Sequence, residues 1–256
     1  QGLTGALGER GDWTWGAEVE VSRSESDGTK AFSDHDFFRT TGRVQLLGPR
    51  SQTDFFAGYQ SKFFGQFGMY TGDIFLAFDP FETESLKTRL FLLNHKQDYA
   101  TDSQFELTAY TRRHSDHYIF NRFAPDRRFI HETNVHALAL SGRHGFNRRL
   151  ALSYAGQITA DDIDSTNLEQ SFTSRTSAKL TMLPEYRIDL DESEQLTLRA
   201  GASFNNTNRD SDQISALLDA TWTRERANGH SEKVYLAYTE SSQVAGYTAI
   251  GGSTTS

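Results

Sequence analysis

Apolar and polar residues alternate along most of this chain with a period of two. The clearest case is the segment 13–21, in which Trp13, Trp15, Ala17, Val19 and Val21 alternate with polar or small residues. Similar alternation recurs over residues 38–46, 178–182, 196–204, 214–222 and 234–238. Successive side chains of a strand point to opposite faces of a sheet, so this pattern predicts strands with one apolar face. Helical spacing is almost absent, and the chain is predicted to form about twelve strands.

The links between these segments differ in length in a regular way. Short polar links alternate with mostly longer ones, and only the link NRDSDQ departs from this rule. Outer-membrane barrels have short turns on the periplasmic side and long loops outside. The runs 103–118 and 148–163 also exceed the roughly 5–6 residues usual in soluble strands and reach the roughly 9–11 needed to cross hydrocarbon. Both features favour a barrel wall.

The sequence therefore predicts an all-β fold, an antiparallel transmembrane β-barrel segment of about twelve strands. We expect the apolar positions to lie on the convex face and the charged ones on the concave face. The convex set is Trp13, Trp15, Leu198, Ala200, Ile214 and Leu218, and the concave set is Glu18, Arg199 and Asp219. Pro184 lies inside a predicted strand, where it cannot donate to the ladder, so we expect a bulge or an interruption there.

Composition narrows the function classes. The 256 residues carry 26 basic and 34 acidic side chains, a net charge of −8, which disfavours a nucleic-acid partner. The chain has no cysteine, which excludes disulfides, thiolate zinc sites and cysteine catalysis. No stretch approaches the roughly 18 apolar residues of a membrane-spanning helix. The 19 Phe, 10 Tyr and 3 Trp make disorder a poor fit, since so many rings need an ordered environment.

Several phrases occur in the order seen in one protein family. TDFFAGYQSKFFGQFGMYTGD, LFLLNHKQDY, FELTAYTRRHSDHYIFNR and YLAYTESSQVAGYTAI each join a predicted strand to an outer loop. In these phrases the chain resembles the barrel portion of TonB-dependent outer-membrane receptors, near the cobalamin and siderophore transporters. The resemblance covers most of the chain.

The resemblance implies a barrel of about 22 strands that is filled by an N-terminal plug and takes up a scarce nutrient. We expect residues 1–256 to be a partial barrel domain, an open part of that barrel without the plug and the C-terminal strands. The implied location is the outer membrane of a Gram-negative cell. The implied partners are a small nutrient ligand such as a siderophore or cobalamin, membrane lipid, and the TonB system, which acts through the missing plug region.

Aromatic rings in the outer loops are the candidate ligand contacts, because rings supply contact area and a few polar groups set orientation. The segment 65–84 provides most of them, and the end of the run 103–118 with the residues after it provides the others. The candidate ligand-binding residues are Tyr70, Asp73, Phe75, Phe78, Phe81, Tyr118 and Arg122. The alternative is that these rings pack against neighbouring loops or belong to an interfacial aromatic belt.

Asp161, Asp162 and Asp164 stand where a predicted strand enters an outer loop. Three hard oxygen donors close together are suited to calcium, and some cobalamin receptors use loop aspartates in this way. Calcium is the one cofactor that the sequence suggests, although DDID matches no EF-hand pattern. The alternative is a solvated acidic surface.

Catalytic motifs are absent. The chain has no GxSxG elbow, no Walker glycine loop and no GxGxxG after a strand, so we expect no enzyme. Two other functions remain open beside the receptor: a soluble β-rich binding or adhesion module, and a passive twelve-stranded pore.

Overall fold

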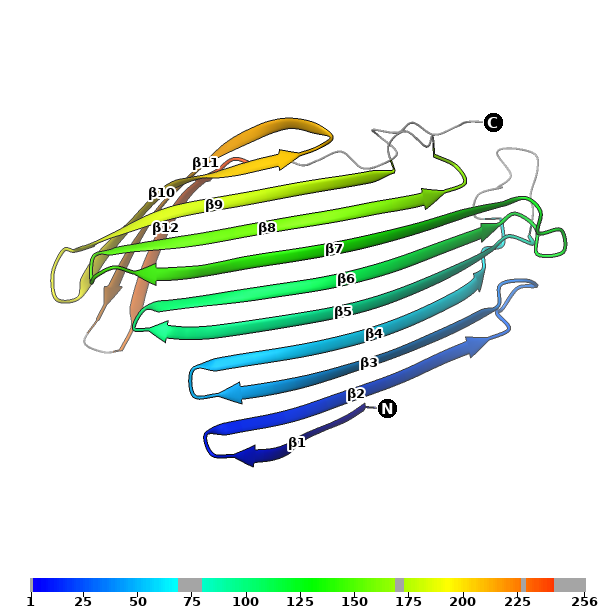
Figure 1. The fold of residues 1–256 in the computed structure, drawn as a ribbon, viewed down its shortest axis with the longest axis horizontal. Helices are drawn as coiled ribbons and strands as arrows, with labels where there is room; N and C mark the ends of the chain where they lie inside the picture. Colours follow the sequence, from blue (N-terminus) through cyan, green and yellow to red (C-terminus); the bar gives the residue numbers. More distant parts are fainter. Residues whose placement is uncertain (1, 69–79, 169–172, 227–228, 242–256) are drawn as a thin grey trace.

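Twelve antiparallel strands follow one another along the chain and form one sheet (Figure 1). The computed structural model describes residues 2–68, 80–168, 173–226 and 229–241. Each strand pairs with its neighbours in sequence, so the order in the sheet is β1 to β12. The strands are β1 (Gly2–Arg10), β2 (Trp13–Ser26), β3 (His35–Gly48), β4 (Ser51–Gly65), β5 (Thr83–Ala100), β6 (Ser103–Ile119), β7 (Arg128–Gly145), β8 (Leu150–Ser165), β9 (Ser174–Asp189), β10 (Glu194–Thr207), β11 (Asp210–Glu225) and β12 (Ser231–Thr239).

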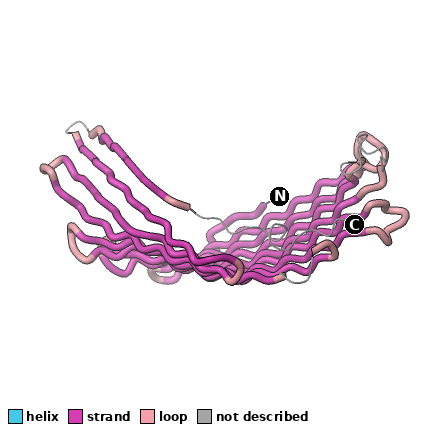
Figure 2. Tube along the Cα trace, turned by 90° about the horizontal axis from the view of Figure 1, so that it is seen from above, coloured by secondary structure: helices cyan, strands magenta, loops and turns pink. Residues whose placement is uncertain are grey.

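The predicted all-β, antiparallel architecture of about twelve strands is confirmed. The sheet is open, and β1 and β12 are its two edges. Figure 2 shows that it is strongly bent rather than flat. The described part of the chain contains no helix of the length and hydrophobicity that crossing a bilayer requires.

Turns and loops separate to the two ends of the sheet, as the link lengths predict. The turns at the left of Figure 1 are short, and two of them have only two residues each, because Arg10 pairs with Trp13 and Ala100 with Ser103. These turns need a left-handed residue, supplied by Gly11 (φ 62°) and by Asp102 (φ 59°). We call this side the turn end. The opposite side, which carries mostly longer connections, is the loop end.

The sheet has almost no apolar core. Its accessible surface is 16976 Å², against roughly 11,000 Å² for a compact soluble monomer of this mass. Among the described residues, the buried apolar side chains are Tyr118, Ala137 and Ala151. A single layer of strands therefore leaves both of its faces open, and its stability depends on what covers them.

Pro184 interrupts the ladder between β9 and β10, as expected. Glu185 pairs with Arg199 and Met182 with Ala202, but the positions between them are unpaired and the register is unchanged. A Cβ atom added to Gly201 would lie 2.0 Å from the carbonyl oxygen of Met182. Glycine at this position therefore lets the two backbones approach where proline has removed a hydrogen-bond donor.

Candidate functional site

One face of the sheet is apolar. Pairing fixes this face strand by strand: Trp15 lies opposite Leu46, and Leu198 opposite both Tyr186 and Ala220. Among the described strand residues, the exposed large apolar side chains belong to this face apart from Leu47 and Tyr235. Its main members are Trp13, Trp15, Val19, Val21, Val44, Leu46, Phe55, Phe91, Leu93, Leu107, Leu138, Leu140, Ile158, Leu180, Met182, Leu198, Phe204, Ile214, Leu218, Val234 and Leu236.

The apolar face forms a band of limited depth. In β2, β8, β9, β10 and β11 the apolar positions of this face cover about 9–11 residues each, the length that a tilted strand needs to cross hydrocarbon. Beyond the band, toward the loop end, the same face becomes charged. Arg113 of β6 forms an ion pair with Glu132 of β7 there, and Arg23 of β2 forms one with Asp36 of β3 at 3.1 Å. The long strands thus extend past the apolar band.

Aromatic residues border the band at the turn end. Tyr99 stacks on His144, with ring centroids 5.9 Å apart, and its hydroxyl lies 2.9 Å from Nδ1 of that histidine. His144 in turn contacts Phe146, and Phe105 lies beside Tyr99. Rings with a polar edge are typical of the level where hydrocarbon meets water.

The opposite face is polar and crowded. The buried polar side chains of the described strand interiors lie on it: Asp54, Asp161, Glu185, Thr197, Ser203, Thr207, Ser215 and Thr221. Side chains converge on the concave side of a bent sheet and diverge on the convex side, so the crowded polar face is the concave one. Glu18, Arg199 and Asp219 lie on it, and the six predicted convex residues lie on the other face. The sequence assigned both sets to the correct faces.

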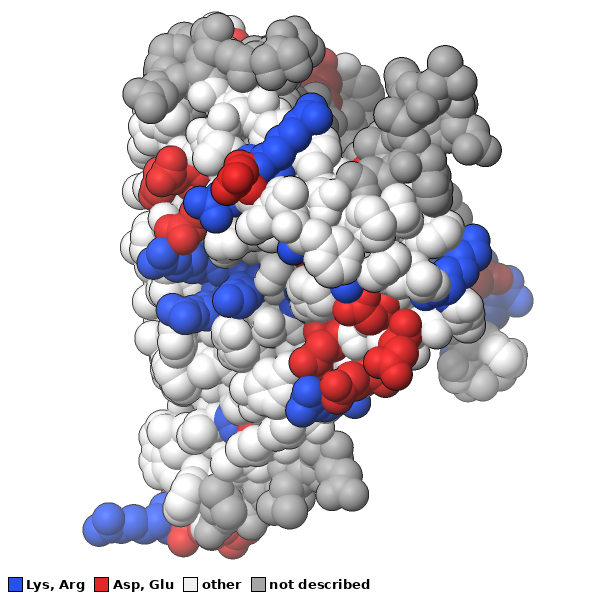
Figure 3. Space-filling model, turned by 90° about the vertical axis from the view of Figure 1, so that its right-hand side faces the viewer, with Lys and Arg blue, Asp and Glu red and all other residues white. Residues whose placement is uncertain are grey.

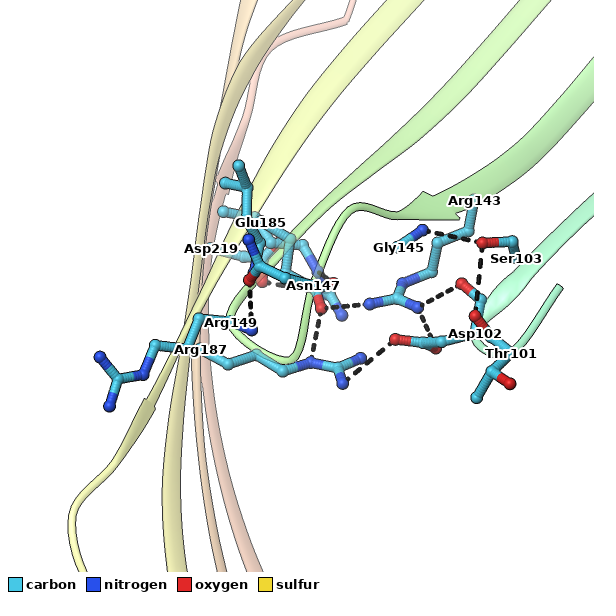
Figure 4. Close-up of polar contacts among 12 residues, drawn as sticks. Thr101, Asp102, Ser103, Arg143, Gly145, Asn147, Arg149, Glu185, Arg187 and Asp219 are labelled. Carbon is cyan, nitrogen blue, oxygen red and sulfur yellow. Dashed lines mark hydrogen bonds and ion pairs between the residues drawn. The ribbon is translucent and has the colours of Figure 1, made fainter.

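A charged cluster at the turn end spans several strands of the concave face (Figure 4). Glu185 is 1% exposed and accepts hydrogen bonds from three arginines: Arg143 on β7, Arg187 on β9 and Arg199 on β10. Arg199 also contacts Asp219 on β11 at 3.2 Å. We call these residues, with Asp102, the Glu185 cluster.

Asp102 of the β5–β6 turn closes the Glu185 cluster. It forms ion pairs with Arg143 and, at 3.3 Å, with Arg187. The hydrogen bond from Arg143 holds the pKa of the Asp102 carboxyl below its ordinary value. Because acids and bases alternate here, each charge has an opposite partner, and the cluster ties β7 to β9 across the intervening strand β8.

A second polar group lies on the concave face nearer the other edge. Asp54 accepts hydrogen bonds from Arg43 at 2.8 Å (Nε), Gln45 at 2.9 Å and Gln52 at 2.6 Å. A hollow of about 530 Å³ lies beside it and is lined by Arg39, Arg43, Glu18, Glu20 and neighbouring residues. Charged walls of this kind are suited to contact with water or with a polar partner.

Three loops meet at the loop end around two predicted ligand-binding residues. Phe81 packs edge-to-face on Phe32 (4.8 Å between ring centroids) and on Phe123 (5.2 Å). The guanidinium of Arg122 lies 5.6 Å from the Phe32 ring and donates to Asp34 at 2.8 Å. These five residues, here called the loop cluster, join the β2–β3, β4–β5 and β6–β7 connections.

The loop cluster was found only in part by sequence reasoning. Phe81 and Arg122 were predicted, while Phe32, Asp34 and Phe123 were missed because their loops are distant in sequence. Phe123 is 68% exposed, so the cluster presents an open aromatic surface. The hydrogen bond from Arg122 lowers the pKa of Asp34 below its ordinary value.

Tyr118 has a different environment. It is 7% exposed and contacts Phe120 (4.8 Å between ring centroids) and Phe129 (6.2 Å), which places it in a packed aromatic group at the end of β6. This is the alternative considered above, in which a ring packs against its neighbours. The predicted residues Tyr70, Asp73, Phe75 and Phe78 lie outside the described residues.

Acidic side chains gather on the loop end of the molecule, with basic side chains beside them (Figure 3). Glu82 is fully buried there, and the Gln66 amide donates to the Glu84 carboxylate. Oδ1 of Asp116 is buried without a hydrogen-bond partner in the described structure. The loop end therefore combines an open aromatic surface with acidic groups.

The three candidate calcium ligands do not converge. They lie inside β8, where neighbouring residues alternate between faces: Asp161 is on the concave face, and Asp162 and Asp164 are on the other. Asp161 forms an ion pair with Arg175 at 3.0 Å, and Asp162 accepts a hydrogen bond from Asn134 at 3.0 Å. Across the described ranges, no group of three His, Cys, Asp or Glu side chains is arranged to hold a metal ion.

Comparison with known protein families finds no family that matches the sequence. A search of curated proteins likewise finds no significant match.

Proposed function

We propose that this chain forms part of the barrel wall of a TonB-dependent outer-membrane receptor, which takes up a scarce nutrient such as a siderophore or cobalamin. The observation that carries the proposal is the apolar band of the convex face, about 9–11 residues deep. Aromatic rings border it at the turn end, and charged pairs such as Arg113–Glu132 follow it toward the loop end. Hydrocarbon of matching thickness covers such a band, and each inner strand is hydrogen-bonded to a neighbouring strand on both sides.

The concave face supports an aqueous interior. Its charged side chains are paired with one another, as in the Glu185 cluster, and the hollow beside Asp54 is lined by further charges. A polar wall of this kind suits a channel that encloses water and a plug. The receptor class, the plug and the TonB partner rest on the sequence resemblance.

The loop cluster is the proposed ligand contact. Its exposed ring, Phe123, is held by Phe32 and Phe81, and Arg122 and Asp34 supply charge beside it. Rigid aromatic surface with a few oriented polar groups is the usual composition of a small-molecule site.

Tryptophan fluorescence tests the membrane contact directly. The sequence has 3 Trp, and all of them, Trp13, Trp15 and Trp222, lie on the apolar face. In phospholipid vesicles with brominated acyl chains, we expect strong quenching of this fluorescence and little quenching by acrylamide in water. A protein that stays folded and monomeric in buffer without detergent, with acrylamide as the effective quencher, would instead be the soluble binding module.

Electrical recording separates the receptor wall from a passive pore. The proposed wall needs the remaining strands and a plug, so the 256-residue chain should give no stable conductance in planar bilayers. Stable unitary conductance from this chain would identify a twelve-stranded pore and overturn the receptor proposal.

A further inference from the structure

A groove of about 780 Å³ crosses the apolar face over the last five strands. Leu150 and Tyr186 line its β8–β9 side, Ala200 and Ala220 lie in its middle, and Leu236 lies on β12. The small alanines leave room between larger neighbours, so the groove is an elongated apolar depression on a face that otherwise carries projecting side chains.

The groove descends from the turn end into the apolar band. Leu150, Tyr186, Leu198, Ala220 and Leu236 form one row of paired positions across the strands. Leu150 is the first residue of β8, whereas the last three lie well inside β10, β11 and β12. Because adjacent strands are about 4.8 Å apart, the row is roughly 19 Å long. One end of the groove is therefore at the turn end, and the other is within the band.

A positively charged side chain, that of Arg149, lies at the turn end of the groove. Arg149 directly precedes Leu150, and its side chain points away from the Glu185 cluster, toward the apolar side (Figure 4). The backbone N–H of Arg149 donates to Asn147 Oδ1, and its carbonyl accepts from Arg187. These bonds fix the backbone, while the guanidinium is exposed and has no acidic partner among the described residues.

Two acidic groups of the nearby β9–β10 turn have partners of their own. In the β9–β10 turn, Asp191 accepts hydrogen bonds from Ser193, and Glu194 contacts Arg224 at 3.2 Å. Arg149 is thus available to an external anion at the mouth of an apolar groove.

We propose that this groove binds one anionic phospholipid, with the phosphate on Arg149 and an acyl chain along the row from Leu150 to Leu236. The proposal rests on the proposed function, because it requires the apolar face to meet a bilayer whose turn-end leaflet contains phospholipid. Charge complementarity selects the headgroup, and the small residues in the middle of the groove select an unbranched apolar chain.

Native mass spectrometry of the detergent-solubilised protein tests this site, with dioleoyl phosphatidylglycerol and dioleoyl phosphatidylcholine as probes. We expect one phosphatidylglycerol to bind about tenfold more tightly than phosphatidylcholine, because the choline cation of phosphatidylcholine offsets the charge of its phosphate beside Arg149. Arg149→Gln should abolish this preference. Arg50→Gln is the matched control, since Arg50 is an exposed arginine in another tight turn and does not line the groove.

A groove-filling variant gives a second readout. Ala220→Phe should weaken binding of both lipids while heat-modifiable migration confirms folding. Equal binding of the two lipids to the wild type, or an unchanged preference in Arg149→Gln, would overturn the lipid site even if the tryptophans are quenched by brominated lipid. Failure of that quenching would overturn the proposed function and the lipid site together.

Discussion

Arg143 of β7 and Glu185 of β9 form an ion pair of 2.7 Å across the intervening strand β8. The residue beneath this contact is Ala151, which is 3% exposed and small enough to let the two long side chains meet above it. On a flat sheet, strands two positions apart are separated by roughly 10 Å. The two long side chains span this distance on the concave face, and their contact links β7 to β9.

Replacing Glu185 should destabilise the sheet strongly. Glu185→Gln keeps the shape of the side chain but leaves Arg143, Arg187 and Arg199 without their shared acid. We expect a loss of about 3–5 kcal/mol in the free energy of unfolding, the range for removing one partner of a buried ion pair. Urea unfolding followed by tryptophan fluorescence would measure it. Glu194→Gln, in the more exposed pair with Arg224, should cost under about 1 kcal/mol, and equal losses would contradict the buried cluster.

The close approach of β9 and β10 beside Pro184 leads to a second prediction. In Gly201→Ala the new methyl group would lie 2.0 Å from the Met182 carbonyl oxygen, so β9 and β10 must separate. We expect a cost of about 1–3 kcal/mol. In Gly156→Ala the nearest atom is 3.9 Å away, and the change should be close to neutral. Urea unfolding midpoints of the two variants measure this difference. A Gly201→Ala midpoint as high as that of Gly156→Ala would disprove the close approach.

A charge on the convex face distinguishes lipid from water. Leu138 is 50% exposed on β7, within the apolar band. If lipid covers it, Leu138→Arg should cost about 2–4 kcal/mol for folding into vesicles. Tyr235→Arg, on the concave face and 59% exposed, should change stability by about 0.5 kcal/mol or less. Small and similar effects at both positions would argue against lipid.

Low pH should weaken the loop cluster by protonating Asp34. Arg122 lowers the pKa of Asp34, so the folded carboxylate holds its proton less tightly than an unfolded one. The stabilisation by this pair is fully present above the ordinary value of 3.8 and is lost as the pH falls through the lowered pKa. Pepsin digestion at matched pH would compare the wild type with Asp34→Asn. The variant should be cut faster at pH 5, and the difference should shrink as the pH falls below 3.8. A ratio that does not vary with pH would refute the ion pair.

Local pattern was sufficient to predict the strands and their faces. The alternation around Trp13 and Leu198 fixes which side chains share a face, because pairing register can only preserve or invert a period of two. The turn residues Gly11 and Asp102 lie in links recognisable by length and composition. The interruption of the ladder at Pro184 was also predictable, because proline has no backbone N–H to donate.

Contacts between distant loops could not be predicted in the same way. Phe32 and Phe123 meet Phe81 because the sheet brings three connections to one end, and no local spacing records that. The calcium interpretation of Asp161 and Asp162 treated adjacent acids as neighbours in space, whereas strand geometry sends them to opposite faces. The Glu185 cluster was missed because its members come from a turn and several strands that are far apart in the sequence.

Pairing of each strand only with its sequence neighbours makes the hairpin the modular unit of this molecule. During folding, the sheet can extend by adding one hairpin at a time to an existing edge, and no contact between remote segments is needed first. Loss or duplication of a hairpin during evolution would change the width of the sheet while leaving the chemistry of the surviving ladders intact. An architecture of this kind can vary its width without redesigning its parts.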